Sequence, residues 1–212
     1  MPFQNKASIV DIGEVRQKIK QSAAWSGFRY RERVDSTNDW LRRVDNPRPG
    51  LVVMAETQTK GRGRRGSTWH SPPGGLWTSF LLKVSEPPRN RLISLEVITA
   101  LREAVEEFGI QARVVWPNDL YARGKKLGGV LVETCGDLAI VGVGLNVNND
   151  FSEMPKGVSE RSVSMKQVLD KPTQLEEVLL CLLDKVTTCL ELSVESRSQL
   201  SSDQRSQLSD SK

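Results

Sequence analysis

An apolar stripe in the middle of the chain limits what it can fold into. Between residues 92 and 108, large apolar side chains recur every three or four positions, which is the spacing of one face of an α-helix. These side chains are Leu92, Leu95, Ile98, Leu101, Val105 and Phe108. A helix with one apolar face needs another layer to cover it, and strand candidates stand on both sides of this helix in the sequence. We therefore expect it to pack on a β-sheet.

The expected strands come in runs and hairpins, not as an alternation of strand and helix. They span residues 51–56, 76–83, 112–116, 128–133 and 138–147. Pro117 ends the third strand, and Cys135-Gly136-Asp137 is a hairpin signal between the last two. Further helices are expected after residue 36 and over 173–190. The pattern predicts an α+β fold in which helices lie on one side of a mixed, mostly antiparallel sheet.

The two ends of the chain depart from this pattern. Residues 1–34 hold a modest amphipathic stretch, which is too short for a helix-turn-helix domain with its own core. Residues 193–212 contain eight Ser and three Gln, so they offer too little apolar surface to offset the entropy lost on ordering. We expect one domain over residues 1–192 and a disordered Ser/Gln-rich tail over 193–212.

Composition argues against several classes of protein. Three cysteines without metal-like spacing favour a reducing compartment, and Cys181 and Cys189 fit small core positions of the last helix. No apolar run approaches the ~20 residues that cross a bilayer, and the N-terminus lacks the pattern of a secretion signal. A formal net charge of +4 is too small to indicate a nucleic-acid partner by itself. We expect a cytoplasmic protein without a membrane contact.

The clearest chemical signal is the segment Gly61–Trp69, which interleaves glycines with arginines after the expected strand 51–56. Glycine lets backbone N–H groups approach an anion closely, and arginine presents planar charged forks to phosphate or carboxylate oxygens. Residues 60–65 carry four positive charges and no negative one, so we expect the loop to be mobile until an anion fills it. Arg-Gly segments also bind RNA, but one short cluster between strands favours a small anionic ligand.

Four more polar segments accompany this loop at strand ends or in loops. They are Ser36-Thr37-Asn38, Glu56-Thr57-Gln58, Trp116-Pro117-Asn118-Asp119 and Lys125-Lys126-Leu127-Gly128-Gly129. Together the segments resemble the biotin protein ligases, which attach biotin to a lysine of a carboxylase carrier domain. The resemblance runs from about residue 35 to residue 148. It rests on five motifs in order: Asp-Ser-Thr-Asn, Ala-Glu-x-Gln-x-x-Gly-Arg-Gly-Arg-Arg-Gly-x-x-Trp-x-Ser, Trp-Pro-Asn-Asp, Lys-Leu-Gly-Gly-Val-Leu-Val-Glu and Gly-x-Gly-Leu-Asn-Val-Asn.

The resemblance implies a catalytic domain with the fold of class II aminoacyl-tRNA synthetases. It implies ATP-dependent activation of biotin to biotinyl-5'-AMP and transfer of biotin to the biotin carboxyl carrier domain of acetyl-CoA carboxylase. A carboxylate and an α-phosphate held ~4 Å apart repel each other by about 4 kcal/mol at an effective dielectric constant of ~20, so the site must supply cations. The expected catalytic cations are Arg62, Arg64 and Lys126.

The same resemblance implies a binding role for each matching residue. The expected biotin contacts are Ser36, Thr37, Asn38, Gln58, Arg62, Gly63, Arg64, Lys126, Gly128 and Gly129. The expected nucleotide contacts are Arg64, Arg65, Trp69, Asn118, Asp119 and Asn146. Mg²⁺ is expected to share the charge of the phosphates, with Asp119 as a candidate ligand.

Several of these residues have plainer interpretations. The Ser36 segment also suits a helix cap, which does not exclude contact with a ligand. Gly142 and Gly144 either let a ligand approach the sheet or mark a bulge. Trp116 is interpreted as a core residue, and Lys125 as a solvated neighbour of the inward-facing lysine.

Two other functions compete with the ligase. A lipoate protein ligase shares the fold and the adenylate chemistry but lacks the Gly/Arg loop. A non-catalytic biotin sensor or repressor is the second alternative. Ligases that also repress transcription carry an N-terminal DNA-binding domain, which residues 1–34 are too short to form. Members of the family usually carry a small β-barrel after the catalytic core, and the Ser/Gln-rich segment stands in that position here. Without the barrel we expect activity that is weak, slow in the transfer step, or absent. The sequence leaves open a monomer or a homodimer.

Overall fold

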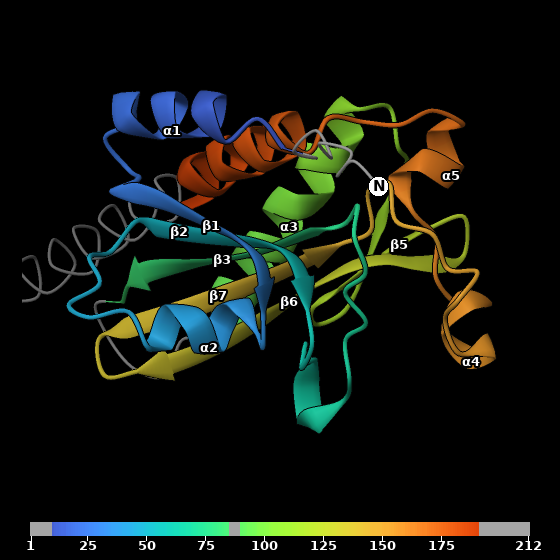
Figure 1. The fold of residues 1–212 in the computed structure, drawn as a ribbon, viewed down its shortest axis with the longest axis horizontal. Coiled ribbons are helices and arrows are strands. Elements are labelled where there is room, and N and C mark those ends of the chain that lie inside the picture. The colour runs from blue at the N-terminus through green and yellow to red at the C-terminus, as the bar shows by residue number, and fades with distance from the viewer. Residues whose placement is uncertain (1–9, 85–89, 191–212) are drawn as a thin grey trace, which may run out of the picture.

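The protein is described by a computed structural model that covers residues 10–84 and 90–190 (Figure 1). Its centre is a seven-stranded sheet with the strand order β1-β2-β3-β7-β6-β5-β4. The strands are β1 (Gly27–Val34), β2 (Leu51–Gln58), β3 (Leu76–Lys83), β4 (Arg113–Val115), β5 (Asp119–Ala122), β6 (Lys125–Cys135) and β7 (Leu138–Leu145). The β1–β2 pair is parallel and the other described pairs are antiparallel. The prediction of a mixed, mostly antiparallel sheet is confirmed.

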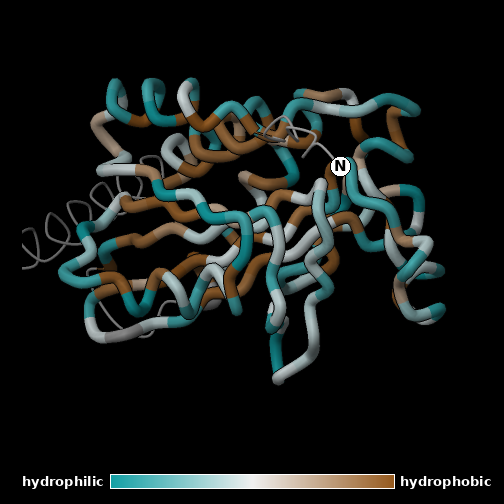
Figure 2. The backbone as a smooth tube through the Cα atoms, viewed as in Figure 1, coloured by the Kyte–Doolittle hydropathy of each residue, from teal (hydrophilic) through white to brown (hydrophobic). Residues whose placement is uncertain are grey.

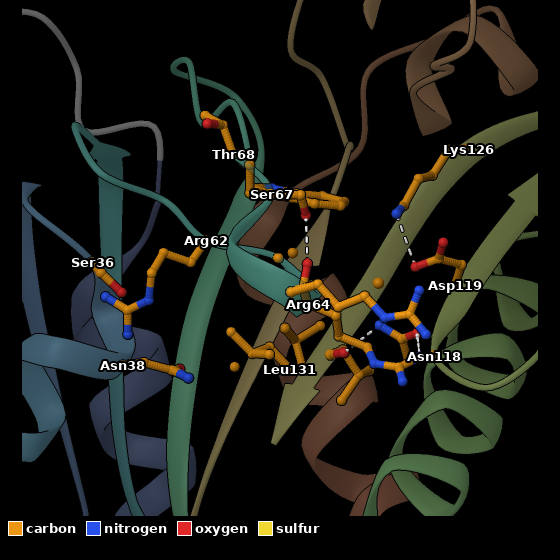
Figure 3. Close-up of a pocket in the computed structure, with 18 of the residues that line it drawn as sticks. Ser36, Asn38, Arg62, Arg64, Ser67, Thr68, Asn118, Asp119, Lys126 and Leu131 are labelled. Atoms are coloured by element: carbon orange, nitrogen blue, oxygen red, sulfur yellow. Dashed lines mark hydrogen bonds and ion pairs between the residues drawn. The ribbon is translucent and has the colours of Figure 1, made fainter. Parts of the chain in front are cut away.

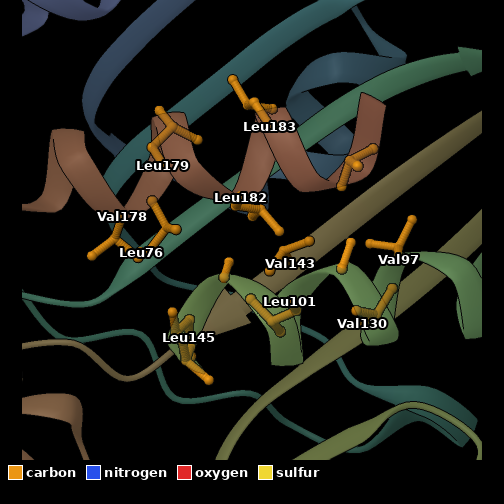
Figure 4. Close-up of a cluster of buried hydrophobic side chains, with 14 of the residues drawn as sticks. Leu76, Val97, Leu101, Val130, Val143, Leu145, Val178, Leu179, Leu182 and Leu183 are labelled. Atoms are coloured by element: carbon orange, nitrogen blue, oxygen red, sulfur yellow. The ribbon is translucent and has the colours of Figure 1, made fainter. Parts of the chain in front are cut away.

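Helices connect and cover these strands. They are α1 (Ile12–Gln21), α2 (Thr37–Arg42), α3 (Asn90–Glu107), α4 (Lys156–Ser159), α5 (Met165–Leu169), a 3-10 turn (Arg64–Gly66) and an unlabelled helix over residues 175–190. The helix 175–190 packs beside α3, and both bury leucines and valines against the sheet (Figure 4). Apolar residues accordingly follow the central strands and the inner helices, whereas the loop between β2 and β3 is polar or neutral (Figure 2).

Helices cover both faces of the sheet, so the prediction that they lie on one side is wrong. Successive side chains of a strand point to opposite faces. Val52 and Met54 of β2 belong to the large core with α3, whereas Val53 and Ala55 pack in a second cluster with Trp40 of α2. The apolar run that begins β2 therefore needs cover on both sides, as continuous apolar strands do. Helix α2 supplies it on the face opposite to α3 (Figure 1).

At the start of α3, the buried side chains are not the ones that the sequence predicted. Leu92 and Leu95 are exposed, and Ile93 and Val97 are buried instead. Three residues turn an α-helix by about 300°, which is about 60° less than a full turn. Side chains spaced only by three therefore move progressively around the helix and leave the buried face. Farther along, the predicted spacing alternates three and four, and it follows the buried face. The buried side chains there are Ile98, Leu101 and Val105.

Several elements were not predicted, and each is short or polar. Strand β1 carries arginines at alternate positions and forms one edge of the sheet, where charged side chains are common. Strand β5 has four residues and is joined to β6 by a turn in which Arg123 and Gly124 have φ values of 50° and 75°. Two-residue hairpin turns favour such positive φ values. Helices α4 and α5 have four and five residues, too few for an apolar period to be read.

The remaining predictions about the chain ends and the membrane have separate outcomes. The predicted tail over residues 193–212 lies outside the described residues. The amphipathic stretch near the N-terminus forms α1, which buries Val15 and Ile19 and is capped by Asp11. Within residues 10–84 and 90–190, no helix has both the length and the apolar character needed to cross a membrane.

Candidate active site

A cavity of about 460 Å³ lies beside the first turn of α2, under the loop that joins β2 to β3. It brings together most of the predicted site residues, which come from separate parts of the sequence. Those that line it are Ser36, Thr37, Asn38, Gln58, Arg62, Gly63, Arg64, Arg65, Trp69, Asn118, Asp119, Lys126 and Gly129. Gly128 and Asn146 do not line this cavity.

One end of the cavity is buried, polar and uncharged. Ser36, Thr37 and Asn38 are each less than 5% exposed. The Ser36 hydroxyl caps α2, so the helix-cap interpretation is confirmed alongside its place in the cavity wall. The backbone N–H of Thr37 donates to Gln58 Oε1 at 2.8 Å, and Gln58 Nε2 donates to Ser71 Oγ at 2.7 Å. These bonds tie the first turn of α2 to the end of β2.

Gly142 on β7 makes room for Asn38. A Cβ atom at residue 142 would lie 2.4 Å from Asn38 Oδ1, which is closer than side chains approach. Ser79 Oγ lies 2.6 Å from the same oxygen and holds it in place. At Gly144, a Cβ atom would lie 2.6 Å from the indole of Trp69. The protein's own side chains therefore fill the space directly beside both glycines, and both glycines also line the cavity. Their predicted role in letting a ligand approach the sheet stays a prediction.

The alternative that Gly142 and Gly144 mark a bulge is wrong. Strand β7 keeps its register with both β3 and β6 through these positions. The irregularity lies instead between β5 and β6, where Leu120 pairs with Gly128 but Tyr121 pairs with Lys126. Leu127 is the extra residue.

This bulge sets the direction of Lys126. Leu127 is fully buried in the core, and a Cβ at Gly128 would lie 3.5 Å from Leu101 on the same side. Two consecutive residues thus face the core, which shifts the alternation and turns Lys126 into the cavity. Lys125 is exposed, as predicted. Gly128 faces away from the cavity for the same reason, so this expected biotin contact does not line the cavity.

Asn146 lies beneath Lys126 and not in the larger cavity. Its side chain is buried, with Nδ2 3.4 Å from the carbonyl oxygen of Lys126 and Oδ1 3.2 Å from Asn149 Nδ2. It lines a second cavity of about 210 Å³. Thr68, Trp69 and Lys126 line both cavities, so the two spaces are neighbours with a shared wall.

The cations of the larger cavity have different partners. Arg62 turns toward α2 and away from Arg64, whose Nη1 donates to Asn118 Oδ1 at 3.1 Å (Figure 3). Lys126 Nζ lies 2.8 Å from an Asp119 carboxylate oxygen and 5.1 Å from the ring centre of Trp69. Among the described residues, neither Arg64 nor the neighbouring Arg65 pairs with a carboxylate. The wall thus has four cations and one carboxylate, which suits an anionic ligand.

Carboxylates from other elements neutralise part of the loop charge, which the sequence did not reveal. Arg62 Nη1 and Nη2 both donate to the Asp39 carboxylate, and Nη2 lies 3.3 Å from Glu133 Oε1. The hydrogen bond from Arg62 lowers the pKa of Asp39. Burial raises the pKa of Glu133, but the hydrogen bond from Asn38 and the charges of Arg42 and Arg62 outweigh it, so the net shift is downward. Both carboxylates are therefore ionised at neutral pH.

Trp69 closes the base of the loop. Its backbone N–H donates to the carbonyl oxygen of Gly61 at 2.9 Å, and its ring meets Trp77 edge-on with a centroid distance of 6.3 Å. The indole Nε1 is buried and has no hydrogen-bond partner in the described structure. An unpaired buried donor costs about 1–3 kcal/mol, so this position offers a donor to an entering ligand.

Two residues of the site were misjudged or missed in the sequence. Trp116 is 66% exposed at the cavity wall, so its interpretation as a core residue is wrong. Strand β4 ends one residue before it, which leaves the side chain in a loop. Glu133 was not singled out. Alternate residues of a strand share one face, so Glu133 lies on the same face of β6 as Gly129 and Leu131, which line the cavity. That alternation was the signal that could have identified it.

The described residues contain no group of three or more His, Cys, Asp or Glu side chains that could hold a metal ion. Asp119 is the one acidic side chain among the described residues that line the larger cavity, and it is paired with Lys126. Cys181 and Cys189 lie partly buried in the helix 175–190, and burial raises the pKa of both thiols. This agrees with their prediction as small core residues.

Comparisons with known proteins gave consistent matches. The model of the "Biotin/lipoate A/B protein ligase family" matches residues 30–148. "Bifunctional ligase/repressor BirA" of Bacillus subtilis (strain 168) is 30% identical over 182 residues, which cover 79% of this chain and 56% of that protein. The protein of the same name from Escherichia coli (strain K12) is 38% identical over 132 residues, which cover 59% of this chain and 41% of that protein. This chain thus spans about half the length of these curated relatives.

A solved structure described as "Biotin protein ligase from Aquifex aeolicus in complex with biotin and ATP" matches with a TM-score of 0.73 and 36% sequence identity. The match covers 79% of this chain and 71% of that chain. A biotin protein ligase from Leishmania major in complex with biotinyl-5-AMP matches with a TM-score of 0.67 and 25% identity, over 81% of this chain and 80% of that one.

Proposed function

Because this chain belongs to the biotin/lipoate A/B protein ligase family, we propose that it activates biotin with ATP and transfers the biotinyl group to a lysine of a carrier protein. Its mixed sheet is that of the class II aminoacyl-tRNA synthetase-like fold of biotin protein ligases. One observation carries the proposal. A single cavity joins a buried, uncharged polar end to an end with unpaired cations, which matches a molecule with a polar ring and an acid tail.

The uncharged end suits the ureido ring of biotin. A urea group has one carbonyl acceptor and two N–H donors, so it needs both kinds of partner at one place. Ser36, Thr37, Asn38 and Gln58 supply hydroxyl and amide groups of both kinds within the cavity wall. A dithiolane ring offers no comparable hydrogen bonds and would place an apolar group against this polar wall, which disfavours lipoate.

The cationic end suits the reacting groups. In the first step a biotin carboxylate oxygen attacks the α-phosphorus of ATP, the bond to the bridging oxygen breaks, and pyrophosphate leaves. Lys126 and Arg64 are the cations that face this region, and they would reduce the repulsion between the two anions. Arg62 is already bound by Asp39 and Glu133, so we assign it to holding the loop. In the second step a lysine amine attacks the acyl carbon and AMP leaves.

The second cavity is the candidate site for the nucleoside part of ATP. It adjoins the larger cavity through Trp69 and Lys126, and Asn146 and Tyr121 contribute to its wall. Trp69 offers a ring face at the boundary. Of the nucleotide contacts expected from the sequence, Trp69 and Asn146 line this second cavity, whereas Arg64, Arg65, Asn118 and Asp119 line the larger one.

Mg²⁺ fits this site as an ion carried by the phosphates. It is commonly bound by one or two carboxylates together with substrate phosphates, and not by a cage of protein ligands. Asp119 is the residue that would hold it, and the ion would offset phosphate charge. The absence of a larger acidic cluster among the described residues is consistent with this arrangement.

We further propose that the acceptor is the biotin carboxyl carrier domain of acetyl-CoA carboxylase and that the protein acts in the cytoplasm, as a monomer or homodimer. The arginines without a carboxylate partner line a concave pocket that also holds buried polar side chains, which favours a small anionic ligand over nucleic acid. Mass spectrometry of a carrier domain incubated with the protein, biotin, ATP and Mg²⁺ tests both steps at once. A gain of one biotinyl group is expected. Modification by lipoate but not by biotin would reject the proposal in favour of a lipoate ligase.

A further inference from the structure

Arg62 is held by two carboxylates that come from different elements. Asp39 lies on α2 and Glu133 on β6. Arg62 Nη2 lies 2.9 Å from Asp39 Oδ1 and 3.3 Å from Glu133 Oε1, and Nη1 donates to the other Asp39 oxygen. Contact of both guanidinium nitrogens with one carboxylate fixes orientation as well as distance. The side chain is thus anchored to two separate walls.

Arg62 sits at the foot of the Gly/Arg loop. It pairs as an isolated bridge with Thr68 on the returning limb, and the N–H of Trp69 donates to the carbonyl oxygen of Gly61. The backbone N–H of Gly63 donates to the carbonyl oxygen of Ser67 at 2.7 Å, so the two limbs of the loop also meet one residue farther from the sheet. Fixing Arg62 therefore fixes both limbs of the loop over the cavity.

Glu133 also touches the uncharged end of the cavity. Its Oε2 accepts a hydrogen bond of 2.7 Å from Asn38 Nδ2. Asn38 is 3% exposed and lines the cavity, and its other amide atom is fixed by Ser79. One carboxylate thus orients the amide of the polar end and anchors the arginine of the loop.

The partial burial of this group makes its ion pairs stronger than those of an exposed surface. The side chains of Arg62, Asp39 and Glu133 are 34%, 23% and 28% exposed. Exposed pairs contribute little because water screens them and their side chains lose entropy. Arg42 pairs with the same two carboxylates from outside, at 2.7 Å and 3.1 Å, and does not line the cavity. It offers a matched control.

We propose that Glu133 is a positioning residue that, together with Asp39, clamps Arg62 and so holds the Gly/Arg loop over the cavity while it orients Asn38 toward the ligand. The identity of that ligand rests on the proposed function. The clamp itself consists of contacts between the protein's own side chains. It also explains why Arg62 turns away from Arg64 in the cavity (Figure 3).

Biotin affinity and steady-state kinetics test the clamp in the full chain. Glu133→Gln keeps an acceptor for Asn38 but weakens the hold on Arg62, so we expect biotin to bind about tenfold more weakly. The KM for biotin should rise by a similar factor. The value of kcat should change less than about threefold, because saturating ligand drives the loop closed. Arg42→Gln should leave both constants within about twofold.

A double-mutant cycle separates the two contacts of Glu133. Glu133→Gln should add little to Arg62→Gln, because both variants break the same contact. Glu133→Ala should weaken binding further even in the Arg62→Gln background, since Asn38 then loses its acceptor. Full additivity of Glu133→Gln and Arg62→Gln would overturn the clamp.

Hydrogen exchange of the ligand-free protein gives a test that does not depend on the ligand. Glu133→Gln should speed exchange of the amides of Gly63 and Trp69, while the amides of α3 keep their wild-type rates. Unchanged loop exchange would overturn the clamp even if the wild-type protein forms biotinyl-5'-AMP. If the wild-type protein binds no biotin, the proposed function fails and the exchange result still decides the clamp.

Discussion

Replacement of Lys126 by alanine tests the charge balance of the cavity most directly. The bulge at Leu127 turns this ammonium group into the cavity, where it faces one carboxylate and no other anion of the wall. Its Nζ lies 2.8 Å from Asp119. When an acid and a phosphate enter, this cation is expected to reduce their mutual repulsion, which is about 4 kcal/mol at ~4 Å and an effective dielectric constant of ~20.

The expected loss follows from that repulsion. Removing one fixed charge stabiliser from an enclosed site commonly costs about 2.7–4 kcal/mol, which is roughly a factor of 10² to 10³ in rate. Lys126→Ala also leaves the Asp119 carboxylate without its partner, so the variant adds repulsion to the loss of attraction. The double variant Lys126→Ala with Asp119→Asn removes that extra repulsion and should recover part of the rate.

Single-turnover formation of biotinyl-5'-AMP, followed by release of labelled pyrophosphate, measures the first step alone. Lys125→Ala is the matched control, because its side chain is exposed one residue away on the same strand. It should stay within about twofold of the wild type. A rate for Lys126→Ala within threefold of the wild type, or an equal loss in Lys125→Ala, would refute the role of Lys126.

Three further predictions address other parts of the molecule. Gly142→Ala should displace Asn38 and weaken biotin binding by about tenfold in a calorimetric titration. Gly27→Ala should not, because its Cβ would make only an ordinary contact of 3.6 Å and Gly27 lines neither cavity; equal affinity in both variants would contradict the tight fit. The hydrogen bond from Arg43 lowers the pKa of Asp35 from 3.8 to about 2. Its stabilisation is therefore present above about pH 4 and lost as the pH falls toward 2. Because the carboxylate is 33% exposed, Asp35→Asn should lower the free energy of unfolding by only about 1 kcal/mol at pH 7 and by less at pH 2.5. Urea unfolding at the two pH values measures this difference, and equal losses at both would argue against the ion pair. Biotin and ATP together should slow hydrogen exchange in the β2–β3 loop, and unchanged exchange there would contradict its role as a lid.

Much of the fold followed from local patterns. Strands β2 and β3, the hairpin of β6 and β7, and helix α3 all have an apolar period or a turn signal that lies within a few neighbouring residues. The edge strand β1 and the short strand β5 lack such a period, so sequence reasoning did not find them.

The candidate site was also predictable only in part. The residue types were evident because glycines, arginines and polar side chains cluster in short motifs. The direction in which these side chains point was not evident from the sequence. Gly128 faces the core and Lys126 the cavity because of one bulge, and that bulge is specified by the pairing of β5 with β6. Trp116 is exposed because β4 ends before it.

By itself the sequence determined the local elements and the chemical groups available to the site, since both depend on neighbouring residues. Only the tertiary structure decided which charges meet. Arg62 and Glu133 are 71 positions apart, and Asn38 and Glu133 are 95 apart, yet each pair is in contact. Electrostatic and hydrogen-bond energies depend on distance in space, and the order of strands in the sheet sets that distance.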